Sequence, residues 1–255
     1  MPHLDRDGTK IYYEDHGSGP AVLLSHGYSA TSKMWAGQAA TFKDRYRVIV
    51  WDMRGHGDTD SPEDPEAYSE VHTIEDMAAI LDACGVEQGV IGGLSLGGYM
   101  SLAFHLKYPE RVRALMLFDT GPGYRNPEAR EKWNERAEHW ATSLEDIGLD
   151  ALGKMGSDEM RKEWHRSAKG LAGAARGMLR QYNSRVMESL PGIEVPTLVL
   201  VGENDKAFIA PTDYMAKKIP NASRVVIMDA GHASNLHQPA AFNDAMGSFL
   251  NRLPE

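Results

Sequence analysis

Residues Gly89 to Gly98, GVIGGLSLGG, begin with a short apolar run, GVIG at 89–92, and continue with glycines around one serine, Ser95. Gly93 and Gly97 lie two residues on either side of that serine, in the pattern Gly-x-Ser-x-Gly. The run is typical of a buried strand, and a helical pattern begins near Tyr99. In a sharp strand-to-helix turn, a Cβ at the flanking glycines would clash, and the serine hydroxyl projects from the sheet edge. The stretch predicts a strand, a tight turn and a helix, with Ser95 as nucleophile.

Two other interpretations compete for this stretch. A glycine-rich turn with an incidental serine would have the same pattern, and so would a loop that cradles phosphate. The sequence lacks the Gly-Lys-Ser/Thr ending of a P-loop and the Gly-x-Gly-x-x-Gly spacing of a dinucleotide site. The patterns of strands and helices in the rest of the chain are therefore needed to distinguish these interpretations.

Five further short apolar runs occur along the chain and are unbroken rather than alternating. They are AVLLS at 21–25, VIVW at 48–51, ALMLF at 114–118, TLVLV at 197–201 and RVVIM at 224–228. Unbroken runs of this length suit parallel strands buried on both faces. Helical patterns lie between the runs, at 35–43, 74–83, 99–107, 213–218 and 240–250. With a β-hairpin in the first twenty residues, the alternation predicts an α/β fold, a mostly parallel, doubly wound sheet of about eight strands.

One interval breaks the alternation. From about residue 121 to 190 no strand-like run occurs, and the sequence has helical patterns rich in tryptophan and methionine. The interval is too long and too apolar for a loop inside a compact domain. We therefore expect a core formed by residues 1–120 and 191–255, with a helical cap inserted at 121–190.

Three tryptophans of this cap, Trp133, Trp140 and Trp164, are candidates for an apolar substrate pocket. Aromatic residues at helical spacing serve packing more often than substrate binding, so a structural role competes with this interpretation. Arg125 lies just past the last strand before the cap. A solvated surface position is expected for it rather than contact with an anionic substrate.

Composition and charge narrow the class of protein. The 255 residues include 42% hydrophobic and 25% charged residues, which is typical of a soluble globular domain. The formal net charge of -9 disfavours nucleic acid and anionic lipid as partners. Because the chain has neither a secretory h-region nor roughly 18 consecutive apolar residues, we expect a cytoplasmic protein without a membrane segment. The single cysteine, Cys84, lies in a helical pattern and is expected to be a buried, inert thiol.

Five motifs, in this order, resemble the α/β-hydrolase superfamily over essentially the whole chain. They are His26-Gly27, Asp52-Met-Arg54-Gly55-His56-Gly57, Gly93 to Gly98, Gly202-Glu-Asn-Asp205 and Ala230-Gly231-His232. The resemblance implies a serine hydrolase in which serine, acid and histidine follow one another along the chain. It also implies that His26 and His56 brace turns rather than take part in the reaction.

The serine requires a base and an acid. A free serine hydroxyl is a poor nucleophile, and His232 is the strongest candidate base among ten histidines. It follows the last predicted strand, so in a parallel sheet it reaches the same carboxyl edge as Ser95. Asp205, after the next-to-last strand, is the expected acid that orients the imidazole. Asp119 ends an earlier strand and is a rival, because some relatives place the acid there.

The oxyanion hole of the family uses two backbone amides. Here they are the amide of Leu96, after the nucleophile, and the amide of Tyr28, after the His-Gly pair. No cofactor or metal is expected, because triad chemistry needs neither and no cluster with metal-ligand spacing occurs in the sequence.

These residues predict a hydrolase of carboxylic esters, with lactones in the same class, that acts on small molecules through an acyl-enzyme. The stretch 233–239, ASNLHQP, is similar to that of enol-lactone hydrolases. Hydrolases of carbon–carbon bonds in aromatic degradation use the same triad and are the closest enzymatic alternative. Epoxide hydrolases and haloalkane dehalogenases have aspartate at the position of Ser95. A ligand-binding module of the same fold, with little or no turnover, is the non-enzymatic alternative.

Overall fold

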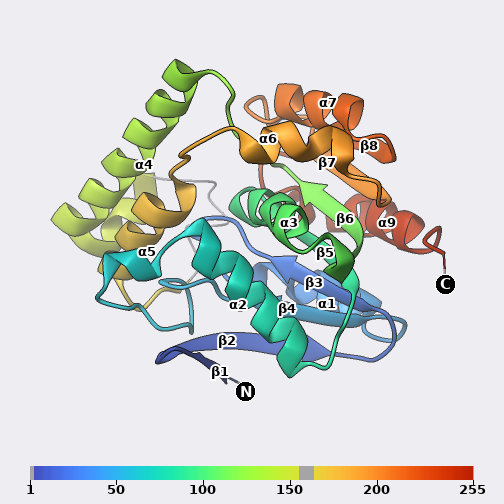
Figure 1. Ribbon diagram of the computed structural model, residues 1–255, viewed down its shortest axis with the longest axis horizontal. Coiled ribbons are helices and arrows are strands. Elements are labelled where there is room, and N and C mark those ends of the chain that lie inside the picture. Colours follow the sequence, from blue (N-terminus) through green and yellow to red (C-terminus); the bar gives the residue numbers. More distant parts are fainter. Residues whose placement is uncertain (1–2, 155–163, 255) are drawn as a thin grey trace.

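Eight strands form one sheet at the centre of the computed structural model, which describes residues 3–154 and 164–254 (Figure 1). In chain order they are β1 (His3–Arg6), β2 (Thr9–His16), β3 (Ala21–Ser25), β4 (Arg47–Trp51), β5 (Gly89–Leu94), β6 (Val112–Phe118), β7 (Thr197–Gly202) and β8 (Ala222–Ile227). Their order across the sheet is β1-β2-β4-β3-β5-β6-β7-β8. Strands β3 to β8 pair in parallel, whereas β1 and β2 form an antiparallel hairpin at one edge. The expected mostly parallel, doubly wound sheet is confirmed.

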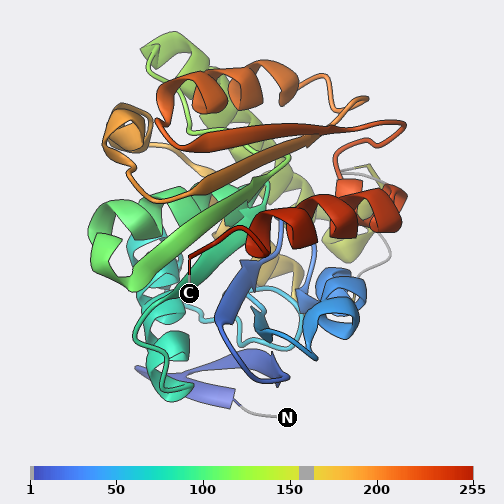
Figure 2. The ribbon, with the colours of Figure 1, turned by 90° about the vertical axis from the view of Figure 1, so that its right-hand side faces the viewer.

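Helices cover both faces of this sheet. Those outside the interval between β6 and β7 are α1 (Ala36–Phe42), α2 (Glu70–Ala83), α3 (Leu96–Lys107), α7 (Ile209–Lys218), α8 (Ser234–His237) and α9 (Pro239–Leu250). Figure 2 shows α1 and α9 on one side of the sheet and α2 and α3 on the other. Among the described residues, no helix is long and apolar enough to cross a membrane.

The central strands are mostly apolar because both of their faces are buried. In β3, Leu23 belongs to the core under α2 and α3, whereas its neighbours Val22 and Leu24 belong to the core under α1 and α9. All three side chains are fully buried. Successive strand residues point to opposite faces, so a strand between two helical layers has no face turned to solvent and favours apolar residues on both faces.

The helix expected at 74–83 begins four residues earlier, at Glu70. Ser69 caps it, because its hydroxyl accepts a hydrogen bond from the backbone N–H of His72. The first turn has few apolar residues, so the hydrophobic pattern by itself placed the start too late. The cap satisfies one of the N–H groups that a helix start leaves without a partner.

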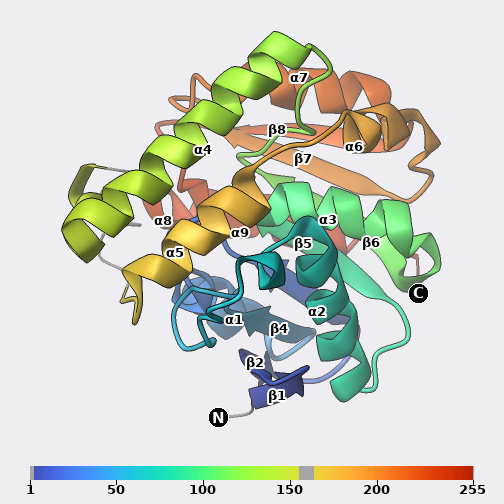
Figure 3. The ribbon, with the colours of Figure 1, turned by 60° about the vertical axis from the view of Figure 1, so that its left-hand side comes forward.

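The interval between β6 and β7 is helical. Its described elements are α4 (Pro127–Ile147), η4 (Gly148–Lys154), α5 (Ala168–Ala174), the π-helical turn η6 (Ala175–Leu179), α6 (Arg185–Ser189) and η7 (Leu190–Gly192). We call residues 121–190 the inserted segment, of which 155–163 lie outside the described residues. Figure 3 shows α4 and α5 side by side.

Two buried histidines brace the loops that follow β3 and β4. His26 accepts the backbone N–H of Met53 at Nε2 (2.9 Å) and donates from Nδ1 to the carbonyl of Gly27 (2.7 Å). His56 accepts the N–H of Ser29 at Nε2 (3.2 Å) and donates from Nδ1 to a carbonyl in its own loop (3.2 Å). Both rings therefore act as neutral imidazoles, with one donor and one acceptor nitrogen each.

A third histidine, His165, joins the inserted segment to the same loops. Its Nδ1 accepts the N–H of Gly57 (3.2 Å), and its Nε2 donates to the carbonyl of Ser29 (3.1 Å). Its ring centroid lies 5.7 Å from that of His56. Protonating any of the three rings would remove an acceptor from a buried N–H group, so the cluster requires neutral imidazoles.

Arg54, in the loop after β4, and Asp76 of α2 form a buried ion pair. The carboxylate accepts from Arg54 Nε at 2.7 Å and from Nη2 at 2.9 Å, and the two side chains are 3% and 0% exposed. The bidentate geometry compensates for the removal of both charges from water. Breaking the pair would leave a buried cation without its anion.

We therefore expect Asp76→Asn to lower the free energy of unfolding by about 3 kcal/mol, because removing one partner strands the other charge. The melting temperature should fall by roughly 6–12 °C. Asp82→Asn is the matched control, since Asp82 pairs with Arg111 at the surface and is 67% exposed. It should change stability by less than about 1 kcal/mol. Equal losses in the two variants, measured by urea unfolding, would contradict the assignment of the buried pair.

The histidine cluster predicts acid sensitivity. Burial holds the pKa of His26 and of His165 at about 4, and that of His56 well below its usual value. In the unfolded chain these groups titrate near pH ~6.5, so between pH ~6.5 and ~4 the unfolded state binds more protons. The contribution of these histidines to the free energy of unfolding is therefore fully present above pH ~6.5. It is lost as the pH falls toward ~4, by about 3 kcal/mol for each histidine with a pKa near 4.

Replacing His165 by glutamine isolates one of these groups. The slope of unfolding free energy against pH, measured between about pH 7 and pH 5, should be smaller in His165→Gln by up to one proton, about 1.4 kcal/mol per pH unit. His139→Gln is the control, because His139 is exposed on α4. Only slopes are compared, since His165→Gln also loses two hydrogen bonds at neutral pH. An unchanged slope in His165→Gln would refute this origin of the acid sensitivity.

Candidate active site

Ser95 occupies the turn between β5 and α3 in a backbone conformation that non-glycine residues rarely adopt, with φ 55° and ψ -114°. Two hydrogen bonds from the end of β6 hold it there. The N–H of Ser95 donates to the carbonyl of Phe118 (2.9 Å), and the hydroxyl of Thr120 donates to the carbonyl of Ser95 (2.6 Å). The strained turn is thus fixed by the neighbouring strand and not by the local sequence alone.

The glycines around Ser95 are required by close contacts. A Cβ on Gly93 would lie 2.4 Å from the carbonyl carbon of Gly97, and a Cβ on Gly97 would lie 2.2 Å from the carbonyl oxygen of Ser25. Backbone atoms cannot yield to such contacts as a flexible side chain would. The turn can therefore form only with glycine at both positions.

His232 and Asp205 lie together beyond the ends of β8 and β7. Nδ1 of His232 donates to Oδ2 of Asp205 at 2.7 Å, and the ring of Phe208 stacks on the imidazole with centroids 4.9 Å apart. Burial by itself lowers the pKa of His232, but the hydrogen bond and charge of Asp205, with the charge of Asp119, raise it above the usual value. Asp205 therefore stabilises the imidazolium form that His232 adopts after it accepts a proton.

Asp119, the rival acid, has other partners. One of its oxygens accepts the N–H of Gly202 (2.8 Å), and the other accepts the hydroxyl of Ser234. Burial raises the pKa of Asp119 to about 7, although both hydrogen bonds act in the opposite direction. Of the two candidate acids, Asp205 is the one hydrogen-bonded to His232.

The two amides expected in the oxyanion hole are available. Within the described parts of the chain, neither the N–H of Leu96 nor that of Tyr28 has a protein acceptor. Leu96 is the first residue of α3, where the helix dipole adds positive potential. The side chain of Tyr28 points elsewhere, since its hydroxyl donates to the carbonyl of Leu171 (2.9 Å). Both N–H groups are therefore available as hydrogen-bond donors to a ligand.

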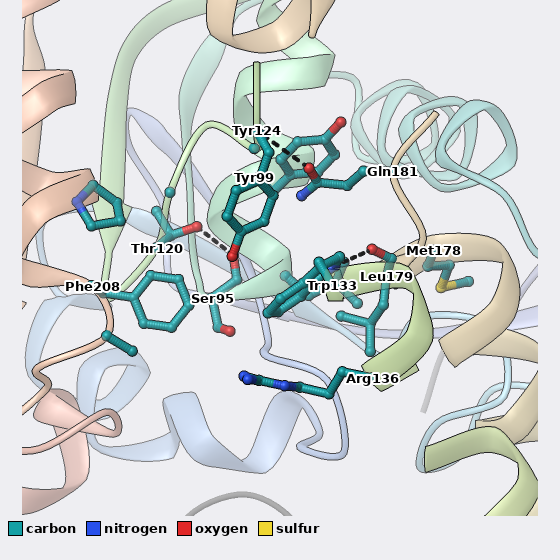
Figure 4. Close-up of a pocket in the computed structure, with 15 residues that line it drawn as sticks. Ser95, Tyr99, Thr120, Tyr124, Trp133, Arg136, Met178, Leu179, Gln181 and Phe208 are labelled. Atoms are coloured by element: carbon teal, nitrogen blue, oxygen red, sulfur yellow. Dashed lines mark hydrogen bonds between the residues drawn. The ribbon is translucent and has the colours of Figure 1, made fainter. Parts of the chain in front are cut away.

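A cavity of about 130 Å³ lies beside Ser95 (Figure 4). It is mostly apolar, and its walls come from the Ser95 turn and the start of α3, Thr120 after β6, the inserted segment, the loop after β7 and the start of α7. Its lining comprises Ser95, Leu96, Tyr99, Thr120, Gly121, Gly123, Tyr124, Trp133, Arg136, Met178, Leu179, Gln181, Ala207, Phe208 and Pro211. In that part of the chain which the structure describes, no three His, Cys, Asp or Glu side chains are grouped to hold a metal ion.

The three candidate tryptophans have different surroundings. Trp133 lines the cavity, and its indole N–H donates to the carbonyl of Leu179 (2.7 Å). Trp140 instead stacks on Tyr28, with centroids 5.8 Å apart and planes 5° apart. Trp164 is 54% exposed and lies outside the lining. Arg125 is exposed and is also outside it.

Sequence reasoning missed most of the lining. One signal was present, because Arg136 follows Trp133 by three residues on the same helix and so shares its face. For Phe208 and Gln181 there was no such signal, since they lie in the loop after β7 and in the stretch after η6. Only the tertiary arrangement brings them to Ser95.

The chain is similar to known proteins over nearly its whole length. Residues 20–148 match the profile of the alpha/beta hydrolase fold family. A thermophilic esterase from Thermogutta terrifontis is similar in structure, with 30% identity, a TM-score of 0.85 and 99% of each chain covered. The enol-lactonase from Burkholderia xenovorans LB400 has 26% identity and a TM-score of 0.84, with 98% of this chain and all of that chain covered.

A third relative, 3-oxoadipate enol-lactonase 2 from Acinetobacter baylyi, is 27% identical over 91% of this chain and 89% of its own. All three similarities extend over the core and the inserted segment. The motifs quoted above therefore occur in a chain whose whole length is similar to these proteins. The protein belongs to the α/β-hydrolase fold family.

Proposed function

We propose that the protein is a serine hydrolase that cleaves carboxylic esters, including cyclic esters, of small molecules through an acyl-enzyme. The observation that carries this proposal is the strained Ser95 turn beside an apolar cavity, together with the Asp205–His232 pair, whose imidazole stacks on Phe208 of the cavity lining. The similarity to an esterase and to enol-lactonases supports the same reaction class.

The proposed chemistry begins with proton transfer. Because Nδ1 of His232 donates to Asp205, Nε2 of the neutral ring has a free lone pair and can accept the hydroxyl proton of Ser95. The serine oxygen attacks the substrate carbonyl, and the charge that develops on the carbonyl oxygen is stabilised by the amides of Leu96 and Tyr28. Asp205 fixes the tautomer and stabilises the imidazolium.

The second half of the reaction reuses the same groups. His232 returns its proton to the departing alcohol oxygen, which leaves Ser95 acylated. A water molecule, deprotonated by His232, then attacks the acyl carbon, and the carboxylic acid is released. In a lactone the alcohol and the acid are parts of one molecule, so a single open-chain hydroxy or keto acid leaves the site.

The cavity restricts the substrate to small molecules. An engineered protein cavity of about 150 Å³ holds one benzene ring. The cavity beside Ser95, at about 130 Å³, is similar and suits one small ring or a short chain. We therefore expect short acyl esters to be better substrates than long ones.

Hydrolysis of short 4-nitrophenyl esters tests the nucleophile. Ser95→Ala should lower kcat by on the order of 10⁴-fold or more, because the acyl-enzyme can no longer form. Ser101→Ala is the matched control, since this buried serine of α3 donates only to the carbonyl of Gly97. A fluorophosphonate should add one mass label to the wild type and none to Ser95→Ala. A wild type no faster than Ser95→Ala would overturn ester hydrolysis.

The acid is tested by paired substitutions. Asp205→Asn should reduce kcat by on the order of 10⁴-fold, because the amide no longer holds the required tautomer of His232. Asp119→Asn should have a much smaller effect on kcat, within about tenfold, and should act mainly on stability. Thermal unfolding of both variants separates loss of fold from loss of chemistry. If Asp119→Asn is the more damaging for kcat, the acid is Asp119.

A further inference from the structure

Arg136 is the only charged residue among those described residues that line the cavity beside Ser95. It projects from α4, and in Figure 4 its guanidinium group points toward the side of the cavity on which the Ser95 hydroxyl lies. The rest of the lining is mainly aromatic, aliphatic or glycine. A permanent positive charge at the wall of an otherwise apolar cavity requires an explanation.

Within the described residues, no carboxylate lies at ion-pair distance from Arg136. A helix places residues three and four positions away next to one another. For Arg136 these neighbours are Lys132, Trp133, His139 and Trp140. None is acidic, although α4 contains several glutamates on its other faces.

Some arginines of the inserted segment have acidic partners. Arg176 binds Glu138 at 2.8 Å and Glu145 at 2.5 Å, and Arg166 binds Asp58 at 2.7 Å. The net charge of -9 means that carboxylates are plentiful in this chain. Arg125, Arg130 and Arg180 also lack a carboxylate partner among the described residues, but Arg136 alone of these four lines the cavity beside Ser95.

The guanidinium group of Arg136 contacts the ring of Trp133. The guanidinium carbon lies 6.0 Å from the centroid of the Trp133 ring, within the range of a cation–π contact. Arg136 is also exposed to solvent, so water screens part of its charge, and the apolar lining strengthens the attraction of an anion only on the cavity side. A planar guanidinium offers two parallel N–H donors, which match the two oxygens of a carboxylate.

We propose that Arg136 is a specificity-determining residue that binds a carboxylate of the substrate. The preferred substrates are then small esters or lactones that have a carboxylate in addition to the carbonyl attacked by Ser95. A single guanidinium balances the single charge of a carboxylate. This inference rests on the proposed function, because it names the substrate class of the same site.

Two matched pairs of esters test the proposal. The first pair is 4-nitrophenyl butyrate and mono-4-nitrophenyl succinate, which places the carboxylate on the acyl side. The second pair is phenyl acetate and 4-acetoxybenzoate, which places it on the leaving group. The quantity measured is the ratio of kcat/KM for the anionic ester to kcat/KM for the neutral one.

Arg136→Gln should lower this ratio by about 10- to 100-fold in at least one pair, because a charge-assisted bidentate contact is lost. Arg136→Lys should retain part of it, since the charge stays but the fork is lost. Arg125→Gln is the matched control, because it removes the same charge from an exposed arginine outside the lining. Its ratios should stay within about twofold of the wild type. Equal changes for both members of each pair in Arg136→Gln would overturn the proposal.

A binding measurement separates this proposal from the catalytic one. In Ser95→Ala protein, tryptophan fluorescence can report binding, since Trp133 lines the cavity. Benzoate should bind at least about tenfold more tightly than benzamide, and Arg136→Gln should abolish the difference. Equal affinities for the two compounds would overturn the carboxylate site. Selective benzoate binding in a protein that hydrolyses no ester would support the carboxylate site and overturn only the proposed reaction.

Discussion

The active-site edge depends on how closely α3 approaches the end of β3. Gly97 lies so near the carbonyl of Ser25 that a single added carbon would overlap it. This approach leaves Ser95 no room for an ordinary helical or extended conformation, and the N–H of Ser95 then pairs with the carbonyl of Phe118 instead. The geometry of the candidate nucleophile is thus a consequence of backbone packing among three parallel strands.

Asp119, which follows β6, connects this strand to the loops that carry Asp205 and His232. Its carboxyl group binds the N–H of Gly202 at the end of β7 and the hydroxyl of Ser234 just after His232. A carboxyl group with both oxygens hydrogen-bonded positions the surrounding loops, and with a pKa of about 7 it is roughly half ionised at neutral pH. Asp205, in contrast, accepts a hydrogen bond directly from the imidazole of His232. Two carboxyl groups near one histidine can therefore have separate tasks.

The strands and the residues of the motifs could be predicted because their signals are local. A strand buried on both faces is apolar along most of its length, as β3 is from Ala21 to Leu24, and a turn of the Ser95 type must have its two glycines. Helix starts were predicted less well, since the polar first turn of α2 follows Ser69 and carries no periodic signal. Strand β5 likewise runs on to Leu94, two residues beyond the apolar run that predicted it.

The cavity could not be predicted in the same way, because its walls come from segments far apart in the chain. Trp140 illustrates the difficulty, since its spacing suits a pocket but it stacks on Tyr28. Tyr28 also donates to Leu171, so the loop with one proposed oxyanion amide is held by the inserted segment. Trp133 and Arg136 lie on the same helix as Trp140 and face the cavity. One helix, α4, therefore contacts both the cavity, through Trp133 and Arg136, and the loop of the proposed oxyanion amide, through the stacking of Trp140 on Tyr28.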